Sequence, residues 1–388
     1  MKKKLLAVLL CFSLLMLCLG GCSSAVKPDD TASVDSSSEE AGHSSSGADE
    51  TSKTEEGNSE DEAGGSSETS SGAESEEQAE QSSEDESQAE DPWFTFEPKV
   101  TSAYMEEIFG EEMIQTWYNL VDAALEGKDT FECPDQRTYD WIMGQFPDRC
   151  FPVLKVLITT SDEPVENGIA HIVYTTSREE FEEKVADFER LVENIINETM
   201  RPEYTDFEKA LSLYSYFSYY YSYDYVTLEL NPLGEDDYTC AYRFLTQGTG
   251  ICREIANAYS FLLMEVGVDA TVMMGERTDM NHQWSYVRIN GHNFHIDPTY
   301  VLGYPDSLAY FMMTDDLRAE DIFPETFVVT SNFTQEYGAP DYIADDDTFA
   351  PIWQGWFDSF DHDSSTLRYH TSNDAGELVY HELNYSGY

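Results

Sequence analysis

The chain has 388 residues, with 76 Asp and Glu against 21 Lys and Arg, which gives a formal net charge of −55. This charge argues against a nucleic-acid-binding protein, because affinity for a phosphate backbone comes mainly from Lys and Arg side chains that displace counterions. The composition changes sharply along the chain, and only the part from residue 93 onward has the apolar content to build a core.

Residues 1–22 have the pattern of an export signal. Three lysines at positions 2–4 precede an apolar stretch, residues 5–19, that is too short for an ordinary membrane-spanning helix. The stretch ends in small residues followed by Cys22, a pattern that resembles the bacterial lipobox, whose cysteine becomes the lipidated first residue of the mature protein. We therefore expect a lipoprotein signal peptide, lipidation at Cys22 and an extracytoplasmic domain anchored to the bacterial cell membrane. The alternative is an uncleaved anchor helix.

Residues 23–92 form a second region of unusual composition. They contain 19 Ser and no Phe, Trp or Tyr, and 22 acids against two lysines give this region a net charge of −20. Such a segment has too little apolar surface to offset its chain entropy. We expect a disordered acidic linker that separates the domain from the membrane. A dedicated binding role for the acidic run is the alternative.

Four cysteines lie beyond the signal and the linker: Cys133, Cys150, Cys240 and Cys252. In an exported domain four cysteines could form two disulfides in three possible pairings, and the sequence leaves the pairing open. No Cys or His spacing of a zinc site is present, so we expect no metal and no cofactor. The three aspartates at residues 345–347 lack the spacing of a calcium loop, and we expect a solvated turn there.

Hydrophobic spacing predicts a helix over residues 113–125 and a strand over residues 168–175. Two further helices are expected to begin after Ser177 and Thr205, because each is followed at capping-box spacing by a glutamate. The tyrosine-rich run over residues 214–225 could form a sugar or peptide platform. Its helical spacing favours core packing instead.

Cys252 lies at the predicted N-terminus of a helix. A short helix over residues 240–246 is broken by Gly248 and Gly250, and the next helix begins near Cys252 and ends at Gly267. Unpaired N–H groups and the helix dipole at this end should lower the thiol pKa and populate the thiolate. A small, inert buried cysteine is the alternative.

A β-hairpin is predicted around the Asn290-Gly291 pair, a strong two-residue turn signal. With this turn, Asp297 lies opposite Trp284 and diagonal to His282, within reach of a hydrogen bond between imidazole and carboxylate. Because side chains alternate between the two faces of a strand, this register brings His282 and Asp297 together on one face.

Together these residues fit covalent catalysis, in which a thiolate, a histidine that exchanges its proton and a carboxylate that orients the histidine act as a unit. The hypothesis assigns these roles to Cys252, His282 and Asp297. His295 shares the face and is the rival base. Trp284 is a candidate for the substrate cleft, and its simplest role is to pack over the site and exclude water. Gln247 is a candidate oxyanion-hole donor, and the alternative is an ordinary polar loop residue.

Three short blocks of sequence carry a resemblance to a known family. They are Gly250-Ile251-Cys252-Arg253-Glu254-Ile255-Ala256, Asn281-His282-Gln283-Trp284 and His295-Ile296-Asp297-Pro298-Thr299. The blocks resemble the transglutaminase-like superfamily, whose fold is related to that of papain-like cysteine proteases, and the family's Cys, His and Asp fall on Cys252, His282 and Asp297. The helix over residues 205–225 and a strand at Tyr310-Phe311-Met312 resemble its bacterial members. Asn281 and Gln283 depart from the family pattern, which leaves the substrate open.

The expected fold is α+β, with a papain-like or transglutaminase-like core in which the nucleophile helix packs on an antiparallel β-sheet. The expected organisation is a signal peptide (1–22), a disordered linker (23–92), an N-terminal α/β extension (93–200), a catalytic core (201–315) and a C-terminal extension (316–388).

The expected function is that of a surface-anchored thiol enzyme that acts on peptide or isopeptide amide bonds through an acyl-enzyme. Hydrolysis, as in a cysteine peptidase or amidase, is favoured, and the expected substrate is a peptide or protein of the cell envelope. Two alternatives remain. One is a cross-linking transglutaminase, and the other is a catalytically silent surface binding protein on the same fold.

Overall fold

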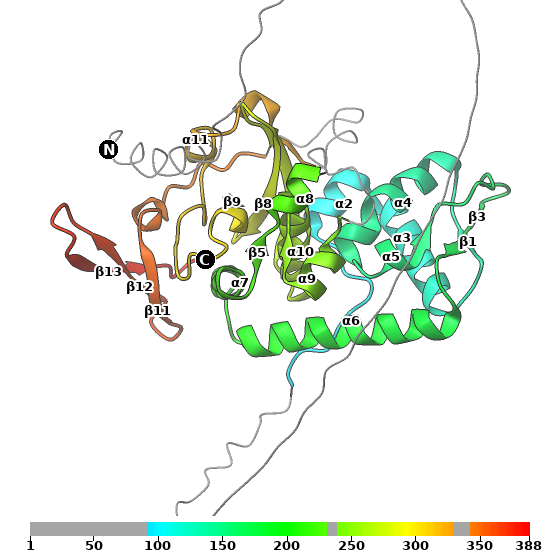
Figure 1. Ribbon diagram of the computed structural model, residues 1–388, viewed down its shortest axis with the longest axis horizontal. Coiled ribbons are helices and arrows are strands. Elements are labelled where there is room, and N and C mark those ends of the chain that lie inside the picture. The colour runs from blue at the N-terminus through cyan, green and yellow to red at the C-terminus, as the bar shows by residue number, and fades with distance from the viewer. Residues whose placement is uncertain (1–91, 231–238, 330–341) are drawn as a thin grey trace, which may run out of the picture. The chain divides into compact units, whose positions relative to one another are not determined.

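The computed structural model describes residues 92–230, 239–329 and 342–388, which belong to one compact unit, Asp85–Tyr388 (Figure 1). Helices and strands are both abundant and the largest sheet is antiparallel, so the predicted α+β class is confirmed. The predicted signal peptide, Cys22 and the acidic linker up to residue 91 lie outside the described residues.

The N-terminal part is a helical layer with short strands at its edge. Its helices are α2 (Ala103–Phe109), α3 (Glu111–Leu125), α4 (Gln136–Cys150) and α5 (Leu154–Leu157). Its antiparallel strand pairs are β1 (Thr130–Glu132) with β3 (Ile169–His171) and β2 (Ile158–Thr159) with β4 (Val173–Tyr174). Helix α3 confirms the helix predicted at residues 113–125. The strand predicted at residues 168–175 is divided into β3 and β4, because its two ends pair with different strands.

Helices α6 (Arg178–Thr199) and α7 (Asp206–Tyr220) begin where the capping signals predicted. The Ser177 hydroxyl accepts the Glu180 N–H at 3.3 Å. A full reciprocal capping box joins Thr205 and Glu208. The predicted apolar stripe is buried: Phe207, Leu211, Tyr214, Phe217 and, directly after the helix, Tyr221. The rest of the tyrosine-rich run is only partly in the core, because Tyr219, Tyr220 and Tyr225 are 56%, 64% and 62% exposed, and α7 ends at Tyr220 and not at residue 225.

A short connecting region leads from α7 to the central helix. Its described elements are β5 (Ser222–Tyr223), α8 (Tyr225–Leu230), α9 (Ala241–Gln247) and β6 (Thr249–Gly250). Strand β5 pairs in parallel with β6, immediately before helix α10 (Cys252–Glu265). Within α10 every residue except Arg253 is buried, as expected for a helix at the centre of a fold.

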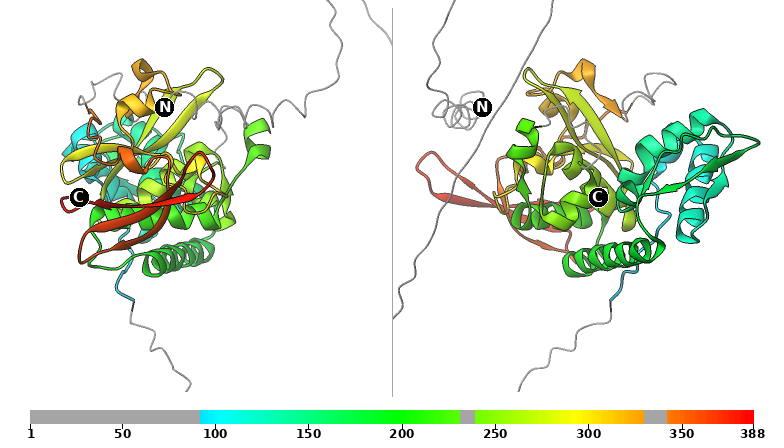
Figure 2. Two further views of the ribbon diagram at one scale, coloured as in Figure 1. Left: turned by 90° about the vertical axis from the view of Figure 1, so that its left-hand side faces the viewer. Right: turned by 45° about the vertical axis from the view of Figure 1, so that its right-hand side comes forward.

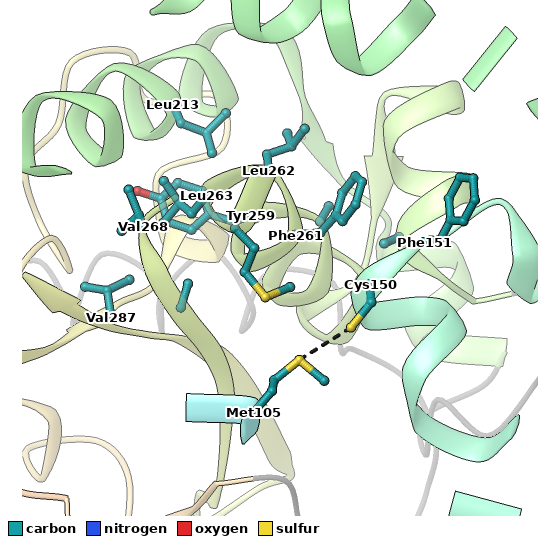
Figure 3. Close-up of a cluster of buried hydrophobic side chains, with 14 of the residues drawn as sticks. Met105, Cys150, Phe151, Leu213, Tyr259, Phe261, Leu262, Leu263, Val268 and Val287 are labelled. Carbon is teal, nitrogen blue, oxygen red and sulfur yellow. Dashed lines mark hydrogen bonds between the residues drawn. The ribbon is translucent and has the colours of Figure 1, made fainter. Parts of the chain in front are cut away.

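Helix α10 packs against a four-stranded antiparallel sheet of order β10-β7-β8-β9. The strands are β7 (Asp269–Glu276), β8 (Asn281–Ile289), β9 (His292–Ile296) and β10 (Val328–Val329). Figure 3 shows side chains of α10, among them Tyr259 and Leu263, in one cluster with Val287 of β8 and Leu213 of α7. The sheet and the helices therefore share one core.

The hairpin β8–β9 has the register predicted from its turn. Tyr286 lies opposite His295, and Ile289 lies opposite His292. The intervening Asn290 and Gly291 have φ values of 48° and 83°, both positive, as this tight turn requires.

The C-terminal part contains the short helix α11 (Asp315–Arg318), three 3₁₀ turns and a three-stranded sheet (Figure 2). The 3₁₀ turns are η1 (Pro298–Tyr300), η2 (Pro324–Thr326) and η3 (Ala350–Ile352), and the antiparallel strands are β11 (Trp356–Asp361), β12 (Thr366–Ser372) and β13 (Leu378–Asn384). The strand predicted at residues 310–312 is wrong. Tyr310 and Met312 have φ values of 63° and 54°, which are incompatible with an extended strand, and only an isolated bridge joins Met313 to His295.

Two further properties concern the described residues as a whole. The four cysteines Cys133, Cys150, Cys240 and Cys252 are all free thiols and all buried, so none of the disulfide pairings considered from the sequence is present. Within residues 92–230, 239–329 and 342–388, no helix is long and apolar enough to cross a membrane.

Candidate active site

Cys252 is the first residue of α10, at the helix end predicted from the sequence. The approach to the helix is tight: a Cβ added at Gly250 would lie 2.8 Å from the Phe244 side chain and 3.1 Å from that of Glu254. The Ile251 N–H donates to the Glu254 carboxylate at 2.9 Å, which closes the first turn of the helix. Glycine at position 250 and glutamate at position 254 therefore fix the position of the thiol.

A buried ion-pair network supports this helix end. Glu254 is fully buried, and its Oε1 accepts Arg243 Nε at 2.7 Å. The same guanidinium reaches Asp224, with 2.9 Å between Nη1 and Oδ2. Arg243 thus connects the segment before α8 to the start of α10. Glu254, which belongs to the sequence block around Cys252, therefore has a structural role in the core.

His282 and Asp297 meet as the hairpin register predicted. His282 is the second residue of β8, and Asp297 directly follows β9. His282 Nε2 lies 2.7 Å from Asp297 Oδ2, and the two residues are 3% and 0% exposed. The Thr299 N–H donates to the other carboxylate oxygen at 3.1 Å, which fixes the plane of the carboxylate.

The charges of these residues depend on one another. Burial opposes ionisation of Cys252, but the neighbouring His282 and the Gln283 main-chain N–H outweigh it, so the pKa of the thiol is lowered. Burial alone would lower the pKa of His282, yet the Asp297 carboxylate and the Cys252 sulfur raise that pKa to about 9. Because Nε2 is held by Asp297, the Nδ1 of His282 is the nitrogen that serves Cys252. The arrangement favours a thiolate, an imidazolium and a carboxylate.

The other three cysteines have the opposite property. Burial raises the pKa of Cys133 to about 11 and that of Cys240 to about 12, and it also raises the pKa of Cys150. Among the four cysteines of the described chain, only Cys252 has a lowered thiol pKa. Burial is common to all four, so the histidine beside Cys252 makes the difference.

Arg318, the last residue of α11, completes the site and was missed in the sequence. It is fully buried, its Nη2 lies 3.1 Å from Asp297 Oδ2, and its guanidinium lies 4.5 Å from the centre of the Trp284 ring. Burial raises the pKa of Asp297, but His282 and Arg318 outweigh it, and the net shift is downward. A single arginine in an acidic segment beyond the recognised blocks carries no local signal for this role.

His295, the rival base, is engaged elsewhere. Its Nδ1 accepts the Trp284 indole N–H at 2.8 Å, and its Nε2 lies 2.7 Å from Asp315 Oδ1. Burial lowers the pKa of His295, so its ring is neutral. Trp284 is itself fully buried beneath Arg318, which corrects its prediction as a substrate-cleft residue, since a side chain without exposed surface cannot contact a substrate.

Two residues near the start of α10 differ from the sequence predictions. Gln247 was predicted as an oxyanion-hole candidate, and Tyr223 was not predicted to be part of the site. Gln247 ends α9 with an exposed side chain, and among the described residues no hydrogen bond connects it to Cys252. Tyr223 is brought to the site by the parallel pairing of β5 with β6, opposite Gly250. Burial raises the pKa of Tyr223, and so does the Cys252 thiol, while the Cys252 main chain acts in the opposite sense. The pairing of β5 with β6 therefore places Tyr223 next to the segment that leads into Cys252.

Acidic and histidine side chains are the natural candidates for metal ligands. In the three described ranges, no group of three or more His, Cys, Asp and Glu residues is arranged to hold a metal ion. Within the predicted solvated turn at residues 345–347, Asp346 is largely buried. It accepts hydrogen bonds from the Tyr388 hydroxyl at 2.6 Å and the Thr348 N–H at 2.9 Å.

Comparison with protein families agrees with this geometry. Residues 193–298 match the family described as the Transglutaminase-like superfamily, and this span includes Cys252, His282 and Asp297. The match confirms the resemblance carried by the three sequence blocks, and residues 193–298 are a transglutaminase-like domain. Among curated proteins, no sequence matches the chain.

Two solved structures resemble parts of the chain. One, from Cytophaga hutchinsonii and described as a "Putative Cysteine Protease", is 18% identical, with a TM-score of 0.21 over 24% of this chain and 32% of that chain. The other, described as a "TGase", is 14% identical, with a TM-score of 0.24 over 39% of this chain and 47% of that one. The chain thus covers less than half of either neighbour.

Proposed function

We propose that the chain is a thiol enzyme that breaks peptide or isopeptide amide bonds through a covalent acyl-enzyme. In this proposal Cys252 is the nucleophile, His282 is the acid and base, and Asp297 orients His282. The observation that supports it most strongly is the buried contact between His282 and Asp297 beside Cys252, with a raised pKa for the imidazole and a lowered one for the thiol. A protein that only binds its partner has no need of this charge distribution.

The proposed reaction has two stages. The Cys252 thiolate attacks the amide carbon, the C–N bond breaks, and the His282 imidazolium gives its proton to the leaving amine, which leaves a thioester on the enzyme. Neutral His282 then takes a proton from the acceptor as the acceptor attacks the thioester. The C–S bond breaks, and the thiolate and imidazolium are restored. The N-terminal end of α10 favours negative charge at the sulfur and at the nearby carbonyl oxygen.

The acceptor in the second stage separates two activities. We favour water, because hydrolysis needs no second binding site, whereas amine transfer needs one that holds a lysine side chain beside the thioester. One observation favours the second candidate, cross-linking: the net charge of −55 attracts cationic amines toward the protein. Both activities share the acyl-enzyme and differ only in what resolves it.

We further propose that the enzyme acts at the cell envelope. The predicted lipid anchor at Cys22 and the predicted linker over residues 23–92 would hold the domain outside the cytoplasmic membrane. Peptides and proteins of the envelope would then be the substrates within reach.

The test incubates the full-length protein with envelope peptides and a labelled primary amine in water enriched in ¹⁸O, followed by mass spectrometry. Hydrolysis would place ¹⁸O in the product carboxyl group, and cross-linking would place the amine there. The Cys252→Ser variant, matched in size, should do neither. If the wild-type protein forms neither product and no thioester can be trapped, the proposed enzymatic function is wrong.

A further inference from the structure

The C-terminal sheet has an outward face that the proposed activity does not use. In β12 the side chains alternate: Leu367 and Tyr369 are 0% and 5% exposed and pack on the core, whereas Arg368 points to solvent. This part of the chain is anchored to the rest by Tyr385, whose hydroxyl donates to the buried Glu208 of α7 at 2.5 Å. The outward face thus belongs to a sheet that is hydrogen-bonded to α7.

A row of three rings crosses this face. Trp356 of β11 lies opposite His370 of β12, and His370 lies opposite Tyr380 of β13. The ring centres are 5.8 Å and 5.9 Å apart. Trp356 and Tyr380 are 40% and 69% exposed, although side chains of this size are usually covered in a folded protein.

Beside the rings runs a row of paired polar groups on the same face. His370 Nδ1 lies 2.8 Å from Asp358 Oδ1, and Arg368 Nε donates to Glu382 Oε1 at 3.0 Å. An open hollow of about 630 Å³ is lined by four residues of this face, Asp358, Arg368, Tyr380 and Glu382, and by His381, which is paired with Tyr369. We name Trp356, Asp358, Arg368, His370, Tyr380 and Glu382 the aromatic face.

We propose that the aromatic face is a binding site for a neutral saccharide chain. A sugar ring offers C–H groups on its faces and hydroxyl groups at its rim, which match exposed aromatic rings beside paired donors and acceptors. Each hydroxyl both donates and accepts, so an adjacent guanidinium and carboxylate can serve neighbouring hydroxyls together. The hollow is within the size range of small-ligand sites.

Charge complementarity decides between this ligand and charged ones. The guanidinium of Arg368 and the imidazole of His370 already face carboxylates of the same row, so an anionic ligand would have to compete with Glu382 and Asp358 for them. The net charge of −55 would also repel such a ligand. A cationic ligand would have to compete with Arg368 for Glu382. A neutral ligand that is rich in hydroxyl groups can use both pairs as they stand.

The inference goes beyond the proposed catalytic function and can fail separately from it. None of its residues belongs to the site at Cys252, so the Cys252→Ala variant should bind saccharides as the wild type does. Its consequence, if both proposals hold, is that the C-terminal extension brings the enzyme to a glycan-bearing surface.

The test titrates the full-length protein with soluble cello- and chito-oligosaccharides and measures binding by calorimetry. Binding of at least one of these probes is expected, and the double variant Trp356→Ala/Tyr380→Ala should weaken it at least about tenfold, since stacking on each exposed ring contributes about as much as it does for nucleobases. The control is Phe323→Ala, which removes an aromatic ring of 42% exposure next to β7 and should leave binding unchanged.

Three outcomes would overturn the proposal. The first is no binding of any neutral oligosaccharide by a protein whose circular dichroism is that of a folded chain. The second is equal loss of binding in the Phe323→Ala control. The third is binding of an apolar peptide or of anionic polygalacturonate, with the same dependence on Trp356 and Tyr380, in place of the neutral probes.

Discussion

The hairpin β8–β9 buries two histidines on one face, and the two have opposite properties. His282 and His295 are 3% and 0% exposed. Their environments raise the pKa of His282 to about 9 and lower that of His295 below its usual value. Equal burial on the same sheet therefore yields one charged ring and one neutral ring.

The neighbours explain the difference. His282 faces the fully buried carboxylate of Asp297 and the Cys252 thiol, two groups that stabilise its positive charge. His295 faces Asp315, whose side chain is 35% exposed and therefore solvent-screened, while the Trp284 N–H donates to its second nitrogen and favours the neutral ring. Residue type and burial together do not define the role of a histidine, because the charge and solvation of its partners decide which protonation state is stable.

The largest expected effect is on turnover and comes from loss of Cys252, the proposed nucleophile that contacts His282 but not His295. Cys252→Ala should reduce turnover by about 10⁴-fold or more, because the acyl-enzyme can no longer form. Cys240→Ala, which removes a buried thiol of raised pKa, should keep its rate per folded molecule. The measurement is initial rate on the substrate identified by mass spectrometry.

Iodoacetamide provides an independent check of the same assignment. Below pH 7 it should modify Cys252 faster than Cys133, Cys150 or Cys240, because only the Cys252 thiol has a lowered pKa. Equal labelling of Cys240 would remove the electrostatic reason for choosing Cys252 as the nucleophile.

The second prediction tests the two histidines separately, by replacing each with alanine in its own variant. His282→Ala should lower the rate by about 10²–10⁴-fold, the usual contribution of a positioned acid–base group. His295→Ala should lose stability and keep most of its rate per folded molecule. In the wild type, activity should fall as the pH rises through about 9, where His282 loses its proton. An inactive His295→Ala with an active His282→Ala would reverse the proposed roles.

The third prediction concerns Arg318, whose guanidinium lies beside Asp297, the carboxylate partner of His282. Arg318→Met keeps the packing on Trp284 but removes the charge beside Asp297, and it should lower the free energy of unfolding by about 3 kcal/mol. The exposed pair of Arg190 with Asp187 on α6 is the matched control, and Arg190→Met should cost about 1 kcal/mol or less.

The pH dependence of the Arg318→Met variant sharpens this result. The pKa of Asp297 lies below its usual value of 3.8, so its stabilising contribution is present above that value and is lost as the pH falls through the folded pKa. Removal of Arg318 should raise the folded pKa and move this loss to higher pH. Identical acid unfolding curves for wild type and variant would contradict the role given to Arg318.

The smallest expected effect concerns the neutral ring of His295. Its folded pKa lies below the usual value of 6.5, so the unfolded chain binds a proton there more readily than the folded one. Stability should therefore fall as the pH decreases below 6.5, by at most about 1.4 kcal/mol per pH unit from this residue. His295→Gln should flatten this slope in urea unfolding measured between about pH 7 and pH 5. A slope that is unchanged in the variant would show that His295 titrates as an ordinary exposed histidine.

Local patterns account for the parts of the site that were correctly predicted. The helix start at Cys252 follows from the glycines before it, and the meeting of His282 with Asp297 follows from a two-residue turn and the alternation of side chains along two strands. These features depend on residues close in sequence, so their geometry can be worked out from the chain alone. The prediction of a strand at residues 310–312 was wrong because Tyr310 and Met312 have positive φ values, which bend the backbone. Neither residue type indicates such a conformation in the sequence.

The sequence by itself determined the class of the core, the helix that presents Cys252 and the hairpin that pairs His282 with Asp297, because each follows from short-range periodicity and turn chemistry. Only the tertiary structure decided the surroundings of these residues: Arg318 behind Asp297, Tyr223 beside Cys252, and the complete burial of Trp284. It also decided that one row of β11–β13 side chains faces solvent. Such contacts join segments far apart in the chain, and their energies depend on burial and on neighbouring charges, which no local pattern encodes.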